Sequence, residues 1–372
     1  MTRRILWLSA WALAASAIPT LAQERRMPDA PPPVGIVRSP GQVSPAPAAP
    51  PPAVPAAEAH PPRRATSEAF GERLLIEVRG LPTAEADAAL RAAVDEIRGI
   101  EDLVDPWRDG TAGLAALNAA AGSGSRTADG RLVELVARAL AFCEWSRGAH
   151  GPLGGRLYLV WGFDGRERGV PPPEEVRQAA GAASCDGVTV DVAAATIGLA
   201  PGRRLDLRGF SRGFAVDRAF DALRGHGADN LIVEIGGVRR VAGDGPNERG
   251  WPIVLPVFPG MERPLDRLDL RDRALALVST VHRPLLVGGD RLAPWLDQRS
   301  GRPATGVVAT AAATELAVDA EALAVALTAL GNREGLLRLG TLEPTPAVLW
   351  LLGDGEGQPL EAPYRWTGLD GS

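Results

Sequence analysis

The segment from Pro28 to Arg64 sets the strongest limit on how this chain can fold. Proline and alanine dominate it and large apolar side chains are almost absent, so it cannot bury enough surface to offset the entropy lost on ordering. The clustered prolines favour a semi-extended tether. We therefore assign residues 23–66 as a disordered linker and expect one folded domain over residues 67–372.

The first residues have the features of a secretion signal. Arg3 and Arg4 precede the apolar run Ile5–Ile18, and Thr20–Ala22 supplies a small-residue cleavage site. The run is too short to span a bilayer as a helix. We therefore predict a signal peptide over residues 1–22, export to the periplasm or beyond, and a mature chain without a transmembrane segment. The two arginines also fit a twin-arginine signal, so the export route stays open.

Composition indicates a globular protein and excludes one class of partner. The 372 residues are 45% hydrophobic and 23% charged, and a net charge of -5 offers no basic surface for nucleic acid. All 40 basic residues are arginine. The two cysteines, Cys143 and Cys185, form either a disulfide, which an oxidising compartment permits, or two buried thiols, and the sequence leaves both open.

Hydrophobic periodicity predicts strands and helices in irregular alternation. Residues 73–79 alternate as a strand, and Thr83 is expected to cap a helix over residues 84–101. Further helices are predicted over residues 131–145, 173–183, 213–224 and 319–330, and further strands over residues 187–192, 230–235, 252–257, 274–280, 305–311 and 347–352. Because no regular βαβ repeat appears, the predicted fold class is α+β.

Two common kinds of catalytic site are not indicated. The four histidines, His60, His150, His226 and His282, are scattered, and none pairs with another at the spacing of metal ligands. A serine nucleophile elbow of the G-x-S-x-G type is also missing. Zinc chemistry and a Ser-His-Asp triad therefore have little support, and the histidines are read as surface or structural residues.

A glycine turn over residues 205–217 is the most informative local motif. Gly209 and Gly213 surround a turn that opens a helix, with Asp206 and Arg212 beside it. Backbone N–H groups at such a helix N-terminus, next to a cation, suit a phosphate or diphosphate. The alternative is a tight turn that needs glycine for its positive φ, and on this motif alone the turn is the simpler interpretation.

Four further segments accompany this turn in order. Leu157–Phe163 contains Trp-Gly-Phe and precedes the turn, whereas Glu234–Arg239, Pro294–Gly301 and Glu321–Val325 follow it. The ordered series resembles the FAD:protein FMN transferase family, the ApbE-type flavin transferases, from about Glu68 to the C-terminus. Five segments in order are far more specific than any single one. The resemblance implies a T-fold-like single domain with two lobes and an FAD-binding cleft between them.

The resemblance also implies a reaction and its participants. The family transfers FMN from FAD to a Thr or Ser hydroxyl of an exported client flavoprotein, within a D-x-x-[ST]-G-A-[ST] target, and AMP leaves. FAD is then the donor substrate, and Mg²⁺ together with a protein cation neutralises the phosphate charge. Export of this chain agrees with clients that lie outside the cytoplasm.

When the site positions of the family are carried over to this sequence one by one, the resemblance implies three groups of site residues. Arg212 and Asp297 take catalytic positions, and Glu321, with Asp319 as a nearby carboxylate, takes the metal position. The FAD-binding positions are Trp161, Gly162, Phe163, Asp206, Gly209, Gly213, Glu234, Gly236 and Gly237.

Several chemical positions depart from the family pattern. Arg212 stands where the family has lysine, Pro294 where it has histidine, and Glu321 and Val325 where it has the metal-binding Asp and Thr. A proline ring transfers no proton and a valine offers no oxygen to a hard cation. Two functions therefore compete: an FAD:protein FMN transferase with a rearranged site, or a catalytically silent FAD-binding carrier or assembly factor on the same fold.

Overall fold

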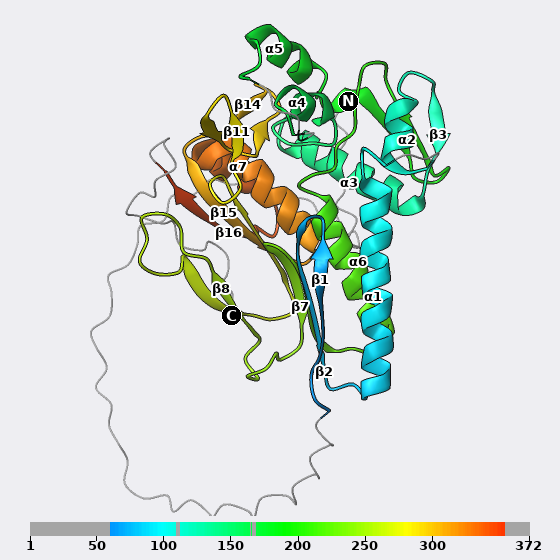
Figure 1. The fold of residues 1–372 in the computed structure, drawn as a ribbon, viewed down its shortest axis with the longest axis vertical. Helices are drawn as coiled ribbons and strands as arrows, with labels where there is room; N and C mark the ends of the chain where they lie inside the picture. Colours follow the sequence, from blue (N-terminus) through cyan, green and yellow to red (C-terminus); the bar gives the residue numbers. More distant parts are fainter. Residues whose placement is uncertain (1–59, 109–111, 164, 166–168, 354–372) are drawn as a thin grey trace, which may run out of the picture. The chain divides into compact units, whose positions relative to one another are not determined.

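Seven antiparallel strands form the central sheet of the protein, in the order β1-β2-β6-β7-β10-β15-β16 (Figure 1). The structure is a computed structural model and describes residues 60–108, 112–163, 165 and 169–353. The predicted signal peptide and most of the predicted linker lie outside these residues. The strands are β1 (Arg63–Ala69), β2 (Glu72–Arg79), β6 (Asn230–Ile235), β7 (Val238–Ala242), β10 (Ala274–Ser279), β15 (Val307–Thr314) and β16 (Ala347–Leu352).

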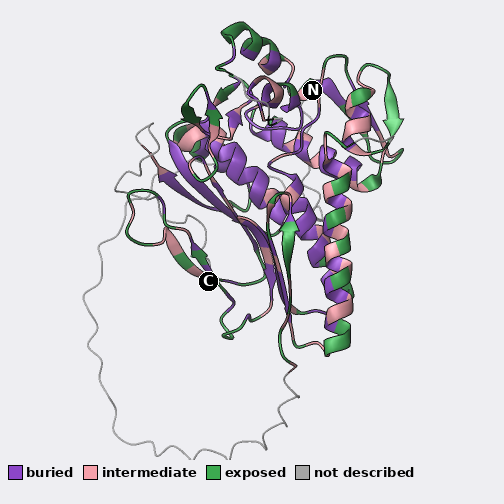
Figure 2. Ribbon diagram, in the orientation of Figure 1, coloured by how far each residue is buried: buried purple, intermediate pink, exposed green. Residues whose placement is uncertain are grey.

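Both faces of this sheet are covered. Helices α1 (Thr83–Val104), α6 (Ser211–Gly225) and α7 (Ala317–Leu339) pack together on one face and bury the larger core there (Figures 1 and 2). On the other face the hairpin of β8 (Trp251–Leu255) and β9 (Asp266–Leu270) encloses a second apolar cluster. Burial of these apolar surfaces is the main force that holds the layers together.

A smaller part of the domain is built from short elements. Its sheet has the order β3-β5-β4, and in addition to the β8-β9 hairpin the described residues form two further two-stranded ladders, β11-β12 and β13-β14. The strands are β3 (Ser125–Thr127), β4 (Val188–Asp191), β5 (Thr196–Leu199), β11 (Leu285–Val287), β12 (Asp290–Leu292), β13 (Leu296–Asp297) and β14 (Arg302–Pro303). The helices are α2 (Gly113–Ala119), α3 (Gly130–Trp145), α4 (Gly155–Val160), α5 (Pro173–Gly181) and the short 3₁₀ turn η1 (Cys185–Gly187).

The α+β class predicted from the sequence is confirmed, and the differences are shifted boundaries and short elements that the sequence did not predict. Strand β1 begins at Arg63, inside the segment assigned as linker, because it pairs along its length with β2. The expected cap of α1 was wrong: Pro82 is the N-cap, and no side chain caps the helix. Helix α7 is interrupted at Gly331, whose φ is 71°. Among the described residues, no helix is long and apolar enough to cross a membrane.

The two cysteines are joined. Cys143, near the end of α3, and Cys185, at the start of η1, form a disulfide with their Cα atoms 5.9 Å apart. This settles the alternative that the sequence left open. The bond closes a loop with a sequence separation of 42 residues and connects the core helix α3 to the short elements that lead to β4.

Loss of this disulfide should lower stability. A Cys143→Ser/Cys185→Ser variant is expected to lose about 2–4 kcal/mol of unfolding free energy, because the unfolded chain regains the freedom that the closed loop removed. Urea unfolding of the oxidised protein and of the variant measures this loss. Equal unfolding free energies of the two proteins would contradict a stabilising role of the disulfide.

The start of α7 is capped by a carboxylate from another helix. Asp217 of α6 accepts hydrogen bonds from the backbone N–H groups of Ala317 and Val318, both at 2.9 Å, and from Nη1 of Arg240 at 3.0 Å. The side chain is buried. Burial raises the pKa of Asp217 from 3.8 to about 6, although Arg240 and the two amides act in the opposite direction.

The raised pKa makes part of the stability depend on pH. The carboxyl group of Asp217 binds its proton more tightly in the folded state than in the unfolded state. The stability that protonation of Asp217 contributes is therefore fully present below about pH 4 and is lost as the pH rises through about 6. An Asp217→Asn variant lacks this loss. Relative to the wild type, its unfolding free energy should therefore improve by up to about 3 kcal/mol between pH 4 and pH 8.

Urea unfolding at several pH values measures the effect. Asp221→Asn is the matched control, since Asp221 lies 3.6 Å from the same Arg240 but is exposed. That variant should follow the wild type at every pH. A difference between Asp217→Asn and wild type that stays constant with pH would contradict the assignment of a raised pKa.

Candidate functional site

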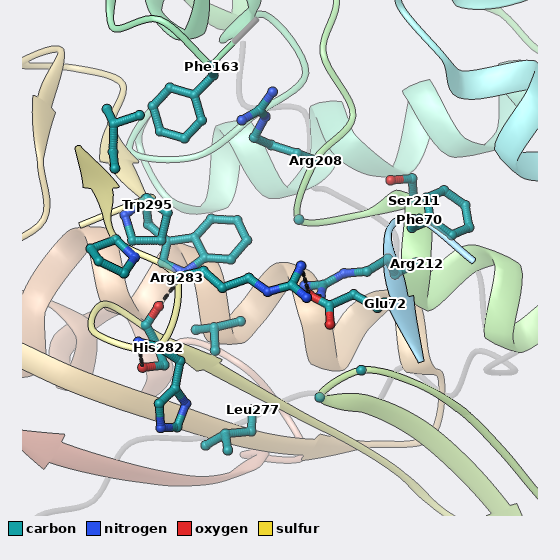
Figure 3. A pocket seen from close by; sticks show the side chains of 18 of the residues that line it. Phe70, Glu72, Phe163, Arg208, Ser211, Arg212, Leu277, His282, Arg283 and Trp295 are labelled. Atoms are coloured by element: carbon teal, nitrogen blue, oxygen red, sulfur yellow. Dashed lines mark hydrogen bonds and ion pairs between the residues drawn. The ribbon is translucent and has the colours of Figure 1, made fainter. Parts of the chain in front are cut away.

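A cavity of about 930 Å³ lies where the ends of several elements meet (Figure 3). Its walls come from the β1–β2 and β6–β7 turns, the N-terminal end of α6, the residues after α4, and the segment that follows β10. Six of the residues predicted from the sequence line it: Gly162, Phe163, Gly209, Arg212, Gly236 and Gly237. The size suits a cofactor or a nucleotide.

Two glycines bring the β6–β7 turn close to its neighbours. A Cβ atom on Gly237 would lie 2.4 Å from the carbonyl oxygen of Leu277, and Gly236 has a φ of 59°. A larger residue at either position would push the turn away from β10 or strain the backbone. The glycines therefore shape this wall of the cavity sterically, because their backbones allow the close approach.

The N-terminal end of α6 forms another wall and also depends on glycine. Gly209 has a φ of 82°, and a Cβ atom there would lie 2.7 Å from Nε2 of His150. The imidazole of His150 stacks on Phe210 and is wholly buried, and this burial lowers its pKa from 6.5 to about 3. Behind the turn there is thus a neutral, packed histidine, and the partial positive charge of the helix end faces the cavity.

Arg212 lines the cavity and is held from behind by α7. Its Nε donates to Oε1 of Glu321 at 2.8 Å, while the backbone N–H of Gly213 donates to Oε2 of the same carboxylate at 2.8 Å. The Glu321 side chain is completely buried. A Cβ atom on Gly213 would lie 2.4 Å from the carbonyl oxygen of Ala317, so this glycine serves the close packing of α6 on α7 and does not contact the cavity.

Arg208, four residues before Arg212 in the same turn, is held in a similar way. Its Nε and Nη2 both donate to the carboxylate of Asp206 at 3.1 Å, and its guanidinium lies over the ring of Tyr158, 3.9 Å from the centroid, and over Phe163 at 4.7 Å. Asp206 also accepts the backbone N–H of Arg208 at 3.0 Å. Asp206 therefore orients an arginine and caps the turn, and it does not line the cavity.

Two further arginines complete the charged lining. Arg239 lies 3.2 Å from Glu234, in an ion pair that lacks hydrogen-bond geometry, and burial lowers its pKa. Arg283 is more exposed and pairs with Glu72 at 2.8 Å. Glu234, predicted to contact FAD, thus pairs with Arg239 and lies outside the cavity lining.

Two predicted residues lie elsewhere. The indole of Trp161 is buried in an apolar cluster, and its Nε1 donates to the carbonyl oxygen of Gly301 at 2.8 Å. Asp297 accepts from the backbone N–H of Arg299 at 3.0 Å and from its Nε at 2.9 Å. Neither side chain lines the cavity. Trp161 therefore acts as a core residue, and Asp297 organises the loop between β13 and β14.

The carboxylates predicted to bind a metal are not brought together. Asp319 pairs with Arg138 of α3 at 2.6 Å, whereas Glu321 pairs with Arg212. Val325, one turn further along α7, is buried and apolar. Over the described part of the chain, no group of three or more His, Cys, Asp or Glu side chains is arranged to hold a metal ion. The residues present do not fit a divalent cation at the predicted position.

Several lining residues were not predicted from the sequence. Arg208 and Arg239 stand inside the motifs that carried the resemblance, so their position beside the glycines of those motifs was an available signal. Ser211 and Trp295 also lie inside such motifs. Other lining residues come from segments without a motif, among them Phe70, Glu72, His282 and Arg283. They become neighbours only when the β1–β2 turn and the segment after β10 fold against α6.

Comparison with known proteins agrees with the ordered motifs. The model of the ApbE family matches residues 70–349. An FAD:protein FMN transferase of Treponema pallidum is 31% identical over 272 residues, which span 67% of this chain and 73% of the relative. An FAD:protein FMN transferase of Rhodobacter capsulatus is 28% identical over 297 residues, spanning 77% of this chain and 54% of the relative.

Solved structures give the same result for the fold. The ApbE protein of Thermotoga maritima superposes with a TM-score of 0.72 at 25% identity, over 82% of this chain and 97% of that chain. The flavin transferase ApbE of Vibrio cholerae gives a TM-score of 0.71 at 22% identity, over 80% and 95%, and shows a common fold. The glycine turns, the cavity that they shape and the match along most of the folded residues lead to one conclusion: the chain belongs to the ApbE family.

Proposed function

We propose that this protein is an FAD:protein FMN transferase, which moves FMN from FAD to a Thr or Ser hydroxyl of a client protein and releases AMP. The observation that carries the proposal is the cavity of about 930 Å³ with Arg208 and Arg212 on its walls, in a chain of the ApbE family. Relatives in this family are FAD:protein FMN transferases. The cavity combines cations for a diphosphate with apolar walls for an aromatic ring.

The lining residues divide the work of binding FAD. Arg208 and Arg212 flank the N-terminal end of α6, where a helix end and two guanidinium groups attract a diphosphate. Phe70, Phe163 and Trp295 provide aromatic surface in the same cavity (Figure 3). Flat aromatic rings such as isoalloxazine and adenine pack well on such side chains. The carboxylates behind the arginines keep the guanidinium groups oriented.

The reaction breaks one bond and forms one. The acceptor hydroxyl oxygen bonds to the phosphorus of the FMN half of FAD, the bond from that phosphorus to the bridging oxygen breaks, and AMP leaves with that oxygen. The hydroxyl proton passes to solvent or to the leaving phosphate. The enzyme contributes position and charge neutralisation, because phosphoryl transfer needs little covalent help from the protein. Arg212 and Arg208 are the cations of this chain that meet that need.

A catalytically silent FAD-binding carrier is the second candidate. It is favoured by one observation: the carboxylates predicted to act in catalysis or metal binding are engaged by arginines, Asp297 by Arg299 and Glu321 by Arg212. The lining acid Glu72 is likewise paired with Arg283. Both candidates bind FAD, so release of AMP separates them.

We further propose that the protein acts outside the cytoplasm. The sequence of residues 1–22 has the features of a signal peptide. The disulfide between Cys143 and Cys185 supports an oxidising compartment, where such bonds persist. Client proteins with an exported flavin domain would meet the enzyme there.

Transfer should be visible with a short acceptor. With FAD and a peptide that carries D-x-x-[ST]-G-A-[ST], the purified protein is expected to release AMP in an amount equal to the flavin that becomes attached to the peptide. Chromatography of AMP and mass spectrometry of the peptide measure both products. The matched control is a peptide with alanine in place of the acceptor hydroxyl residue. FAD binding without release of AMP would contradict the transferase function and favour the catalytically silent carrier.

The cavity wall at the β6–β7 turn should decide FAD affinity. Gly237→Ala places a Cβ atom 2.4 Å from the oxygen of Leu277, so the turn must shift, and FAD affinity is expected to fall at least about tenfold. Gly225→Ala is the matched control, since a Cβ atom there meets nothing within 4 Å. Titration of flavin fluorescence measures both. Unchanged affinity of Gly237→Ala would place FAD away from this wall.

A further inference from the structure

We propose that the guanidinium of Arg212, held by the buried carboxylate of Glu321, supplies the positive charge that a divalent cation would otherwise bring to the FAD diphosphate, so that this chain binds FAD without a divalent metal. The inference rests on the proposed function, because it concerns the same cavity and the same ligand. It assigns the carboxylate at the predicted metal position a different role, that of a positioning residue for an arginine.

The first step concerns the oxygens of Glu321. The side chain is completely buried, Oε1 accepts from Nε of Arg212 at 2.8 Å, and Oε2 accepts from the backbone N–H of Gly213 at 2.8 Å. Each oxygen keeps a second lone pair, but a cation at Oε1 would lie beside the guanidinium of Arg212. Two positive charges would then share one low-dielectric site, which is unfavourable. The carboxylate is therefore already neutralised by a protein cation.

The second step concerns other ligands near Glu321. Val325 lies on the next turn of α7 and is buried with no oxygen to offer beyond its backbone. Asp319 lies two residues before Glu321 and belongs to a separate pair, with Arg138 at 2.6 Å. Mg²⁺ is usually held by one or two carboxylates together with waters and substrate phosphates. Both carboxylates at the predicted metal position, Asp319 and Glu321, are instead paired with arginines.

The third step concerns the charge that the cavity already holds. Four arginines line it, and Glu72 is the acidic residue among the described lining residues. The side chain of Arg212 is 17% exposed, so its guanidinium remains open to the cavity while Nε is held from behind. Nη1 of Arg212 lies 3.9 Å from Glu72, too far for a hydrogen bond. Figure 3 shows Arg212, Glu72 and Arg283 side by side at the centre of the cavity.

The fourth step is the match between this arrangement and a diphosphate. A guanidinium presents several donors in one plane and pairs with phosphate oxygens through two hydrogen bonds at once. A lysine ammonium or a metal ion offers a point charge instead. Arg212 is fixed through Nε, and its Nη1 forms only a long ion pair with Glu72, so its terminal nitrogens can bind an anion. Arg208 adds a second guanidinium to the same cavity, and each guanidinium is oriented and balanced by the carboxylate that holds it.

Metal dependence of FAD binding tests the inference directly. The full-length protein is treated with excess EDTA, and the dissociation constant of FAD is measured by calorimetry in EDTA and again with excess Mg²⁺. We expect the two values to agree within about twofold. Loss of binding in EDTA that Mg²⁺ restores would overturn the inference and leave the proposed function in place.

Variants of the arginine give the second readout. Arg212→Gln is expected to weaken FAD binding at least tenfold in EDTA, and Mg²⁺ should not restore it. The single variant leaves the buried carboxylate of Glu321 with one hydrogen-bond partner fewer, which could weaken the fold. The double variant Arg212→Gln/Glu321→Gln removes that charge and should show the same loss of FAD affinity. Arg138→Gln is the matched control, since Arg138 forms a comparable pair with Asp319 away from the cavity, and its FAD affinity should equal that of the wild type.

AMP release is scored separately from binding. Metal-independent FAD binding without AMP release supports the inference and removes the transferase in favour of the carrier. Absence of FAD binding with and without Mg²⁺ overturns the proposed function and this inference together. Tight binding by both Arg212 variants in EDTA would overturn the inference alone.

Discussion

The site depends on the contacts that the buried carboxylate of Glu321 makes with Arg212 and with the backbone amide of Gly213. A charge without solvent is costly unless it is paired and hydrogen-bonded, and Arg212 and the amide of Gly213 together provide this. The pair ties the first turn of α6 to α7, and the missing side chain of Gly213 allows the two helices to approach. The helix end that faces the cavity is therefore placed by a contact made behind it.

The same arrangement recurs around the cavity. Arg208 is oriented by Asp206, Arg239 pairs with Glu234, and Arg212 is oriented by Glu321. In each case the acid was predicted to contact FAD or a metal, and in the structure it pairs with an arginine. The acids lie outside the cavity lining, while the arginines face the cavity. This explains how a chain with net charge -5 presents several arginines to one cavity.

Local patterns predicted the long elements well and the short ones poorly. The helix over residues 84–101 and the strand over residues 230–235 have clear apolar periods, and both are present in the structure. Strand β1 was missed because its residues are mostly exposed and polar, and only pairing with β2 makes it a strand. Helix α7 begins at Ala317, before the predicted residue 319, because Asp217 of α6 caps its first amides.

The sequence by itself determined the α+β class, the family and the location of the glycine turns. These depend on local periodicity and on ordered motifs, both of which can be read along one chain. Only the tertiary structure decided which acid meets which arginine. Arg212 and Glu321 are 109 residues apart, and Arg138 and Asp319 are 181 apart. Such pairs form where helices from distant segments pack, and neither spacing nor composition records which side chains then share a buried space.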